Sequence, residues 1–507
     1  MSRRALRRRF VLLFSTFGWG CQSPAPAPSS QKAPAPSASV SASASASAKG
    51  LGEASATPPS AKTIHVVQRS IDVVASPAVG SPIVGTVRAG RSVTLALSEA
   101  SVAPDKDCSE GWFAVVPMGF VCAGSGTTRN VDDTSVKILR DYTLASGAAL
   151  PATYGLAEMT PVYMRVPLLD EQLRSEPGVE SHLHKLAASR EGELAARGSD
   201  PRNIDIDLRP SGLDLPDELR KGLFAPPLPK PLMPNSPVVG LLYGGSYIAW
   251  VAEFDAEGRT WLLTPDLFFV PRDKVNRATI SGFHGALVPS GAGVAFIGQR
   301  PERRYRLRPG TKDKFVVDND AWSAGTVVLL AEPALQYSDE KFLETAQPGV
   351  FLKADEAIVV HPTPPSRWGI EAGARWIEIS AKTNVLLERQ GASVVFATLV
   401  SVGDNDSRRG KFRVYSKHLS LGTPFERPRA GIKAEVPEVM LVSDTPDAKP
   451  YPLFGGWWIS TWGMPNATSG VALSPLDARR LFDDTLPALP EGWHSVRGDG
   501  TWVVIHD

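Results

Sequence analysis

From Thr63 onward, short runs of β-branched and apolar residues alternate with polar positions and end at Gly, Pro or Ser. The first runs are IHVV, IDVVAS, SPIVGTVRAG and RSVTLAL, and GWFAVVPMGFVC adds a hairpin around Gly119. A period of two between turn residues is typical of half-buried strands. From Ser236 the pattern partly recurs in SPVVGLLYGGSYIAWVAEF and RTWLLTPDLFFVP. The pattern predicts a mainly β protein, with β-rich regions over residues 63–130 and 236–365.

Residues 375–403, RWIEISAKTNVLLERQGASVVFATLVSVG, continue the alternation over three further predicted strands. Residues 131–235 are less regular, and we interpret them as an irregular or helical connecting region that contains the helix-forming segment VESHLHKLAASREGELAARG. His182 and His184 in that segment are two possible metal ligands, but no further His or Cys lies nearby to complete a site. We therefore expect solvated helix residues there, and we expect no metal site in the chain.

The amino-terminal end has the features of a secretory signal. Residues 1–21, MSRRALRRRFVLLFSTFGWGC, combine a basic head, a short apolar run and small residues before Cys21. This ending resembles a bacterial lipobox, in which the cysteine is lipidated, and Gln22 then favours the outer membrane. An ordinary signal peptide with a chance cysteine is the alternative. Residues 22–62 are almost entirely Ser, Ala and Pro, which predicts a disordered tether.

Charge and cysteine content restrict the remaining possibilities. The 54 basic and 53 acidic side chains nearly balance, which gives no electrostatic case for a nucleic-acid partner, since such a partner would need a basic face. The other two cysteines, Cys108 and Cys122, would lie in an oxidising compartment, where a disulfide is the default. Two buried free thiols are the alternative. Nothing in the sequence indicates a cofactor, and none is expected.

Residues 63–130 resemble a bacterial SH3-like barrel, on the evidence of SPIVGTVRAG, of Gly111-Trp112 and of the closing GFVC. The repeated pattern from residue 236 is similar to a second such unit. Modules of this kind bind cell-wall peptides or act as spacers, and the sequence does not separate the two roles. GFHGALV at 282–288 resembles a segment that follows this unit in cell-wall enzymes, and we expect its His284 to be structural.

Residues 366–507 resemble the L,D-transpeptidase (YkuD-type) domain. The opening segment 375–403, the strand KFRVYSKH at 411–418 and the closing LSPLDARRLFDD with its helix all match that family's pattern. The family's threonine-proline turn is replaced by Asp406-Ser407-Arg408-Arg409, with Gly410 kept. The resemblance implies a β-rich domain whose family members attack a tetrapeptide carbonyl with a cysteine thiolate that a histidine activates.

The reactive residues of that family are missing from this chain. Phe454 stands at the position of the first histidine, and Ala467, Thr468, Ser469 and Gly470 stand at Ser-His-Gly-Cys. No cysteine occurs after Cys122, and no histidine occurs between His418 and His494, so a shifted alignment does not restore the motif. We therefore assign no catalytic residue and treat Phe454, Thr468, Ser469 and Gly470 as degenerate positions.

Three functions are compatible with these observations. The first is a periplasmic, lipid-anchored pseudoenzyme that binds peptidoglycan or an envelope protein, with Gly455, Trp457, Trp458 and Trp462 shaping the groove. Core packing is the alternative role for those residues. The second is an active transpeptidase or peptidase with a relocated nucleophile, such as Ser469. The third is a structural SH3-like spacer or docking protein.

Overall fold

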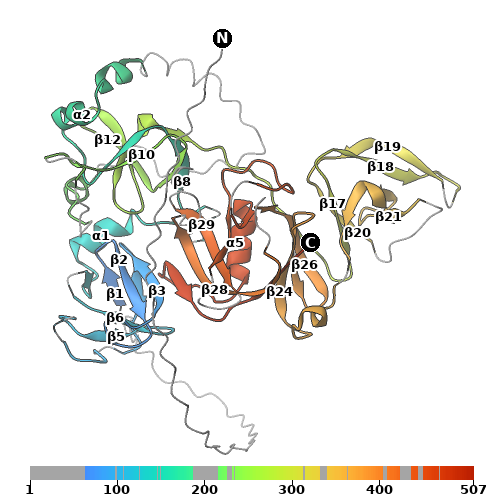
Figure 1. Ribbon diagram of the computed structural model, residues 1–507, viewed down its shortest axis with the longest axis horizontal. Coiled ribbons are helices and arrows are strands. Elements are labelled where there is room, and N and C mark those ends of the chain that lie inside the picture. Colours follow the sequence, from blue (N-terminus) through green and yellow to red (C-terminus); the bar gives the residue numbers. More distant parts are fainter. Residues whose placement is uncertain are drawn as a thin grey trace, which may run out of the picture. The chain divides into compact units, whose positions relative to one another are not determined.

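A computed structural model of the protein describes residues 63–507 with gaps, and the features below concern the described residues alone. The gaps are residues 98–99, 105, 107, 125, 146, 149, 186–214, 225–230, 233–234, 312–313, 332–339, 362, 404–407, 423–434, 444–448 and 467–468. The described residues belong to one compact unit, Ser60–Asp507 (Figure 1). Strands dominate it, so the predicted mainly β class is confirmed. The predicted signal segment, the tether and Cys21 lie outside the described residues.

The first module covers residues 63–128 and consists of short strands, as predicted. One antiparallel sheet has the order β4-β1-β7, and in the other β3 pairs with β2, β2 with β6 and β6 with β5. Alternate side chains point inward, and Ile64, Val73 and Val121 are fully buried. The strands are β1 (Thr63–Val66), β2 (Ser70–Val74), β3 (Ile83–Arg88), β4 (Ser92–Thr94), β5 (Trp112–Ala114), β6 (Phe120–Cys122) and β7 (Thr127–Thr128).

Cys108 and Cys122 form a disulfide, with their Cα atoms 5.6 Å apart. This is the pairing predicted above. Cys122 ends β6, and Cys108 lies at the start of the turn that leads into β5. Hydrogen bonds already join β5 and β6 along their lengths. The disulfide adds a covalent link between β6 and the loop before β5.

The second module differs from its predicted boundary at residue 236. β8 (Thr153–Ala157) and β9 (Thr160–Tyr163) lie in the predicted connecting region, yet β8 pairs with β11 and β15, and β9 pairs with β10 and β14. The assignment of 131–235 as a connector is therefore wrong for these strands. Strands of four and five residues are stable only through their partners, and those partners follow Val238 in the chain, so the local sequence pattern is weak.

The remaining elements between residues 131 and 280 surround these strands. Residues 179–185 are helical, and the rest of the predicted helix VESHLHKLAASREGELAARG lies outside the described residues. The other elements are α1 (Thr134–Arg140), α2 (Leu169–Ser175), α4 (Asp217–Arg220), β10 (Val238–Leu242), β11 (Ser246–Trp250), β12 (Ala252–Ala256), β13 (Arg259–Leu263), β14 (Phe269–Pro271), η1 (Arg272–Lys274) and β15 (Val275–Arg277).

Residues 293–359 form a third module, so the predicted single β-rich region 236–365 contains parts of two units. Its sheets have the orders β20-β17-β23 and β19-β18-β22-β21 (yellow in Figure 1). The elements are β17 (Gly293–Ile297), β18 (Glu302–Leu307), β19 (Phe315–Trp322), β20 (Val327–Leu330), β21 (Phe342–Glu344), β22 (Val350–Lys353), η2 (Ala354–Glu356) and β23 (Ala357–Val359).

The C-terminal domain contains the three strands predicted from residues 375–403, and its closing helix is where the family resemblance placed it. β24, β25 and β26 pair in sequence order, β24 also runs parallel to β33, and β28 pairs with β29, β32 and β33. The helix α5 packs on β29, β30 and β31 through buried side chains such as Leu481 and Phe482. The elements are β16 (Ala286–Leu287), η3 (Pro365–Trp368), β24 (Arg375–Ser380), β25 (Val385–Gln390), β26 (Ser393–Leu399), β27 (Ser401–Val402), β28 (Gly410–Leu421), β29 (Val436–Ser443), β30 (Tyr451–Gly455), β31 (Val471–Leu473), α5 (Pro475–Asp484), β32 (Ser495–Arg497) and β33 (Trp502–His506).

The first module and the C-terminal domain share a sheet and a core. β3 pairs with β32, so that Gly85 lies opposite Val496 and Thr86 opposite Ser495. The Trp493 side chain is buried among the apolar residues of the first module. Gly492 adopts φ +79°, and a Cβ atom there would lie 2.0 Å from the carbonyl oxygen of Ser92. The two parts therefore meet backbone to backbone.

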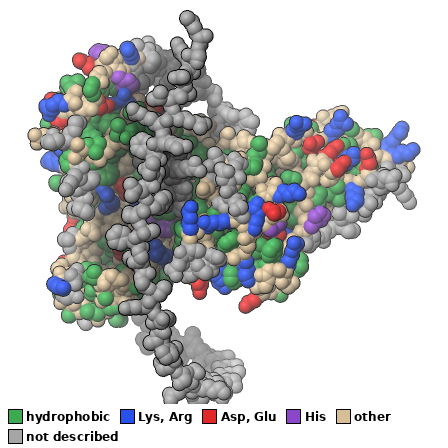
Figure 2. Space-filling model, in the orientation of Figure 1, with side chains coloured by type: hydrophobic (Ala, Val, Ile, Leu, Met, Phe, Trp, Pro, Cys, Tyr) green, Lys and Arg blue, Asp and Glu red, His purple; other side chains and the backbone are tan. Residues whose placement is uncertain are grey.

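Charged side chains of both signs are interspersed on the face shown in Figure 2, which agrees with the formal net charge of +1. In the described part of the chain, no helix is both long enough and apolar enough to span a bilayer.

The close approach at Gly492 generates a stability prediction. Gly492→Ala should lower the free energy of unfolding by about 2–4 kcal/mol, since the added Cβ meets Ser92 in a backbone conformation that L side chains rarely adopt. Urea unfolding followed by tryptophan fluorescence measures the change. Gly498→Ala is the matched control, because the nearest atom to its Cβ would be Cβ of Pro487 at 3.7 Å. Equal stability of the two variants would contradict the prediction.

Candidate functional site

The two halves of the degenerate motif lie on adjacent parallel strands. β30 and β31 pair in register, so that Phe454 lies opposite Ala472 and Gly455 opposite Leu473. Gly470 directly precedes β31. Gly470 itself lies against Pro452, two residues before Phe454, so the two degenerate positions are on neighbouring strands but not directly opposite one another.

Gly470, which the sequence resemblance aligns with the family's cysteine, leaves no room for a side chain. Its φ is +106°, and a Cβ atom built on it would lie 2.4 Å from the carbonyl oxygen of Pro452. Its own carbonyl accepts a hydrogen bond from the Gly403 amide at 3.0 Å. Only glycine fits this backbone without a shift of β30.

Ser469 is exposed. Thr468 lies outside the described residues. A serine nucleophile needs an adjacent general base, and the two nearest histidines in the sequence are engaged elsewhere. His418 Nε2 lies 3.2 Å from Ser416 Oγ, while the His494 side chain is buried and hydrogen-bonded to the backbone of Ser420. Within the described residues, no hydrogen bond connects either histidine to Ser469.

The tryptophans that follow β30 pack against the second module. The Trp458 ring stacks on Phe454 at 5.7 Å between centroids and on Tyr247 at 5.1 Å. The Trp457 ring lies 5.1 Å from that of Tyr154 and 4.9 Å from that of Tyr247. Tyr154 and Tyr247 belong to β8 and β11 of the second module. We call these five residues the aromatic interface.

Trp462 and Gly455 are also packed inside the protein. The Trp462 indole is 4% exposed and donates a hydrogen bond from Nε1 to Ser281 Oγ at 3.2 Å. Its carbonyl accepts from Gln299 Nε2 at 2.8 Å. A Cβ atom at Gly455 would lie 3.0 Å from Pro437 Cγ. Of the two roles considered for Gly455, Trp457, Trp458 and Trp462, the structure favours core packing over an exposed binding groove.

His284 lies in the irregular segment that precedes β16. The next residue, Gly285, donates its amide to Asp477 Oδ1 at 2.9 Å, and Thr398 Oγ1 donates to the same carboxylate. Burial raises the pKa of Asp477, and its hydrogen bonds with Thr398 and Gly285 oppose that shift. Asp477 thus fastens the GFHG segment to the first turn of α5 and to β26. The nearest ring nitrogen contact of His284 is the Gly285 carbonyl, at 2.9 Å.

Sequence inspection missed a set of buried charged groups on β28 and β29. Glu438 is fully buried and has no hydrogen-bond partner among the described residues; the nearest cation is Arg479 NH1 at 3.8 Å. Burial raises the pKa of this carboxyl well above its usual range, and Arg479 opposes the shift. Glu435, directly before β29, pairs with Arg88 of β3 at 2.9 Å. A lone acid inside the apolar run VPEVMLV was the signal that marked Glu438.

Lys417 is buried at the carboxyl end of α5. Its ammonium donates hydrogen bonds to the carbonyls of Phe482 and Thr485, which complement the negative end of the helix dipole. Its side chain also lies over the Phe482 ring, 4.4 Å from the centroid. Desolvation by burial lowers the pKa of Lys417 to about 8.

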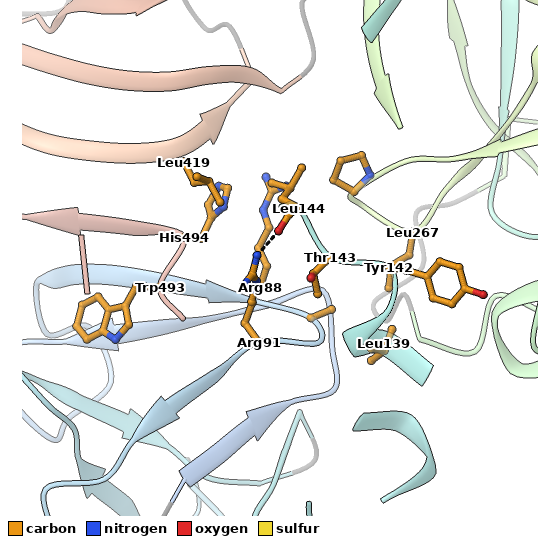
Figure 3. A pocket seen from close by; sticks show the side chains of 12 residues that line it. Arg88, Arg91, Leu139, Tyr142, Thr143, Leu144, Leu267, Leu419, Trp493 and His494 are labelled. Carbon is orange, nitrogen blue, oxygen red and sulfur yellow. Dashed lines mark hydrogen bonds between the residues drawn. The ribbon is translucent and has the colours of Figure 1, made fainter. Parts of the chain in front are cut away.

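A small cavity lies where the first module, the segment after α1, the second module and the C-terminal domain meet (Figure 3). Arg88, Leu144, Leu267 and His494 line it from these four parts, and its volume is about 20 Å³. The guanidinium of Arg91 donates to the Leu144 carbonyl, the dashed line in Figure 3. Such a space holds about one water molecule, so this cavity is too small for an organic ligand.

Metal binding finds no support in the described part of the chain, where no group of three or more His, Cys, Asp or Glu side chains is placed to hold an ion. His182, half of the HxH pair, instead contacts Asp273 through Nε2 at 3.0 Å.

No protein-family model matches the chain, and no curated protein matches it by sequence. Among solved structures, the chain is similar to L,D-transpeptidases. A cysteine-to-serine mutant of the Enterococcus faecium enzyme shares 15% identity over 26% of this chain and 49% of its own, with a TM-score of 0.20. The chain thus spans about half the length of that relative.

Two further solved structures are similar to this chain. The catalytic domain of the E. faecium enzyme shares 16% identity over 26% of this chain and 97% of its own, with a TM-score of 0.20. The Mycobacterium smegmatis enzyme shares 14% identity over 46% of this chain and 90% of its own, with a TM-score of 0.21. These neighbours are β-rich L,D-transpeptidase domains, and the likeness concerns the fold.

The buried histidines at the junction with the first module generate a prediction about pH. Burial, with Arg497 and Arg88 nearby, lowers the pKa of His418 to about 4, while burial lowers that of His494 as well. At pH values between about 4 and about 6.5, His418 is protonated in the unfolded chain but neutral in the folded protein. The free energy of unfolding therefore falls as pH is lowered from about 6.5 to about 4.

In His418→Gln, this fall in the free energy of unfolding should be smaller by up to about 3 kcal/mol.

Urea unfolding at pH 7 and at pH 4.5 measures the difference. His184→Gln is the control, because His184 is exposed on a helical segment. An unchanged pH dependence in His418→Gln would contradict the assignment of this titration to His418.

Proposed function

We propose that the protein is a non-catalytic lipoprotein of the cell envelope, anchored through Cys21 in the outer membrane and facing the periplasm. Its L,D-transpeptidase-like C-terminal domain binds peptidoglycan stem peptides or an envelope protein without reacting with them. The main support for the lack of reaction is the backbone at Gly470, which leaves no space for a Cβ atom at the position of the family's nucleophile.

The chemistry of the position supports this proposal. Thiolate attack needs a cysteine, a histidine that lowers its pKa and donors for the oxyanion. The chain has no cysteine after Cys122, and Phe454 stacks on Trp458 where the first histidine would stand. The disulfide between Cys108 and Cys122 suits an oxidising compartment.

The aromatic interface favours a second candidate, a structural spacer. Trp457 and Trp458 contact Tyr154 and Tyr247 of the second module, so the segment after β30 joins two parts of the protein. In this function the degenerate domain holds the SH3-like modules in fixed order, and partners bind elsewhere.

The lack of reaction is tested with the purified protein and a carbapenem, which forms a covalent adduct with an active nucleophile. Intact-mass spectrometry should detect no adduct, and incubation with sacculi should produce neither 3–3 crosslinks nor released tetrapeptides. A product that disappears in Ser469→Ala would establish the relocated nucleophile instead.

Gly470→Cys provides a sharper form of the same test. Because the new Cβ would collide with the Pro452 carbonyl, this variant should gain no carbapenem adduct and should lose roughly 2 kcal/mol or more of stability. Ser469→Cys, which adds a thiol at the neighbouring exposed residue, is the matched control for folding. An adduct in Gly470→Cys with unchanged stability would contradict the packing argument.

Binding is separated from spacing by a sacculus pull-down with the full-length protein. Sedimentation with peptidoglycan supports the first function, and a protein that stays in the supernatant supports the spacer. The same assay with muropeptides as competitors tells specific binding from adhesion.

A further inference from the structure

Four exposed apolar side chains lie at one end of the first module. Val79 is 69% exposed, Val116 is 48% exposed, and Ile83 and Met118 are each 37% exposed. Val79 lies in the loop between β2 and β3, and Ile83 begins β3. Val116 and Met118 lie in the loop between β5 and β6. We call these four residues the apolar tip.

Strand pairing brings the two loops together. Val74, the last residue of β2, pairs with Ile83 on one side and with Phe120, the first residue of β6, on the other. Phe120 also pairs with Ala114, the last residue of β5. The strands β3, β2, β6 and β5 are thus neighbours in this order, and both loops leave the sheet at the same end (Figure 1).

Short contacts hold both loops in place. The Ala75 amide donates to the Pro82 carbonyl at 2.8 Å, and the Val115 amide donates to the Gly119 carbonyl at 3.0 Å. A Cβ atom at Gly119 would lie 3.0 Å from Cγ2 of Val84 in β3. The loop between β5 and β6 therefore packs against the start of β3, and the apolar tip is part of the folded module.

Neither loop carries a charged side chain. Residues 75–83 read ASPAVGSPI, and residues 115–120 read VVPMGF. Along the four strands, the charged residue nearest to this end is Asp72 of β2. The hydroxyl oxygens of Ser76 and Ser81 lie 2.8 Å apart and bond to one another. An exposed apolar surface without charge, next to a polar rim, is typical of a contact site.

The entry point of the chain indicates the partner. Thr63, the first described residue, pairs with Thr94 of β4. The Thr94 carbonyl accepts a hydrogen bond from the Val116 amide at 2.9 Å. The predicted tether, residues 22–62, therefore joins the module beside the apolar tip. At the roughly 5–6 Å × √n of a linker of n residues, this tether reaches about 35 Å from Cys21.

A lipid bilayer fits both observations. An anchor at Cys21 keeps the first module close to the membrane, and uncharged apolar side chains gain free energy when they leave water for an apolar environment. We propose that the apolar tip inserts into the surface of that membrane, with Val79, Val116 and Met118 between the lipid headgroups.

This inference deepens the proposed function, and the choice of a membrane as the partner rests on the proposed anchoring at Cys21. The two are tested separately. Mass spectrometry of the N-terminal peptide detects lipid at Cys21, whereas binding by the apolar tip is measured on a chain without lipid. Failure of either result leaves the other unchanged.

The test uses residues 22–507, which contain the whole compact unit Ser60–Asp507 and carry no lipid. Co-sedimentation is measured with vesicles of phosphatidylethanolamine and phosphatidylglycerol, and with vesicles of phosphatidylcholine. The protein should bind both kinds, and added salt should not weaken binding, because the apolar tip has no charge. Val79→Ser combined with Met118→Ser should lower the partition coefficient roughly tenfold, because two apolar side chains no longer leave water.

Leu287→Ser is the matched control. Leu287 is 64% exposed and belongs to β16, at the opposite edge of the sheet from β5. This variant should bind vesicles as the unaltered protein does. All three substitutions change exposed side chains, so thermal unfolding should show unaltered folding.

An environment-sensitive dye locates the contact. Cys108 and Cys122 form the disulfide, so a dye coupled to Val79→Cys or to Leu287→Cys reports on that position alone. Its emission should shift to shorter wavelength with vesicles at residue 79 and should stay unchanged at residue 287.

Three outcomes would overturn the proposal. The first is a lack of vesicle binding, or equal binding by the double variant. The second is binding to the anionic vesicles alone that salt abolishes, since charge would then be the cause. The third is self-association without vesicles that the double variant abolishes, since a second copy of the chain would then cover the apolar tip.

Discussion

The close approach of Gly470 to the carbonyl oxygen of Pro452 is the constraint on which the C-terminal domain depends. At 2.4 Å from that oxygen, a Cβ atom has no space, and the tight contact lets β31 run parallel beside β30. α5 then follows β31 after Ser474, whose side chain caps the helix by accepting from the Asp477 amide. The backbone at Gly470 thus serves the packing of two strands.

The junctions between the parts of the protein use contacts of three different kinds. The first module joins the C-terminal domain through main-chain pairing of β3 with β32. The second module joins it through stacked aromatic rings, with Trp458 between Phe454 and Tyr247. The GFHG segment joins it through the buried carboxylate of Asp477. Together these contacts join the first module, the second module and the GFHG segment to the C-terminal domain.

Buried charge is concentrated where these parts meet. Arg88 of β3 pairs with Glu435, Lys417 is bonded to the end of α5, and Glu438 lies without a hydrogen bond near Arg479. Removing such groups from water is unfavourable unless partners compensate the charge. These buried charges distinguish the region from an ordinary apolar core. They also make the free energy of unfolding sensitive to pH.

The sequence by itself determined the fold class, the strands of the first module and the three strands over 375–403, because alternation with period two is a local property of the chain. It also determined that no cysteine follows Cys122 and that no histidine lies between His418 and His494, since residue identities need no coordinates. Only the tertiary structure decided where the second module begins, because β8 and β9 owe their stability to strands after Val238. Likewise, only packing decided that Trp457 and Trp462 are internal and that Gly470 admits no Cβ. Burial and close approach arise from residues far apart in the chain, and no local pattern encodes them.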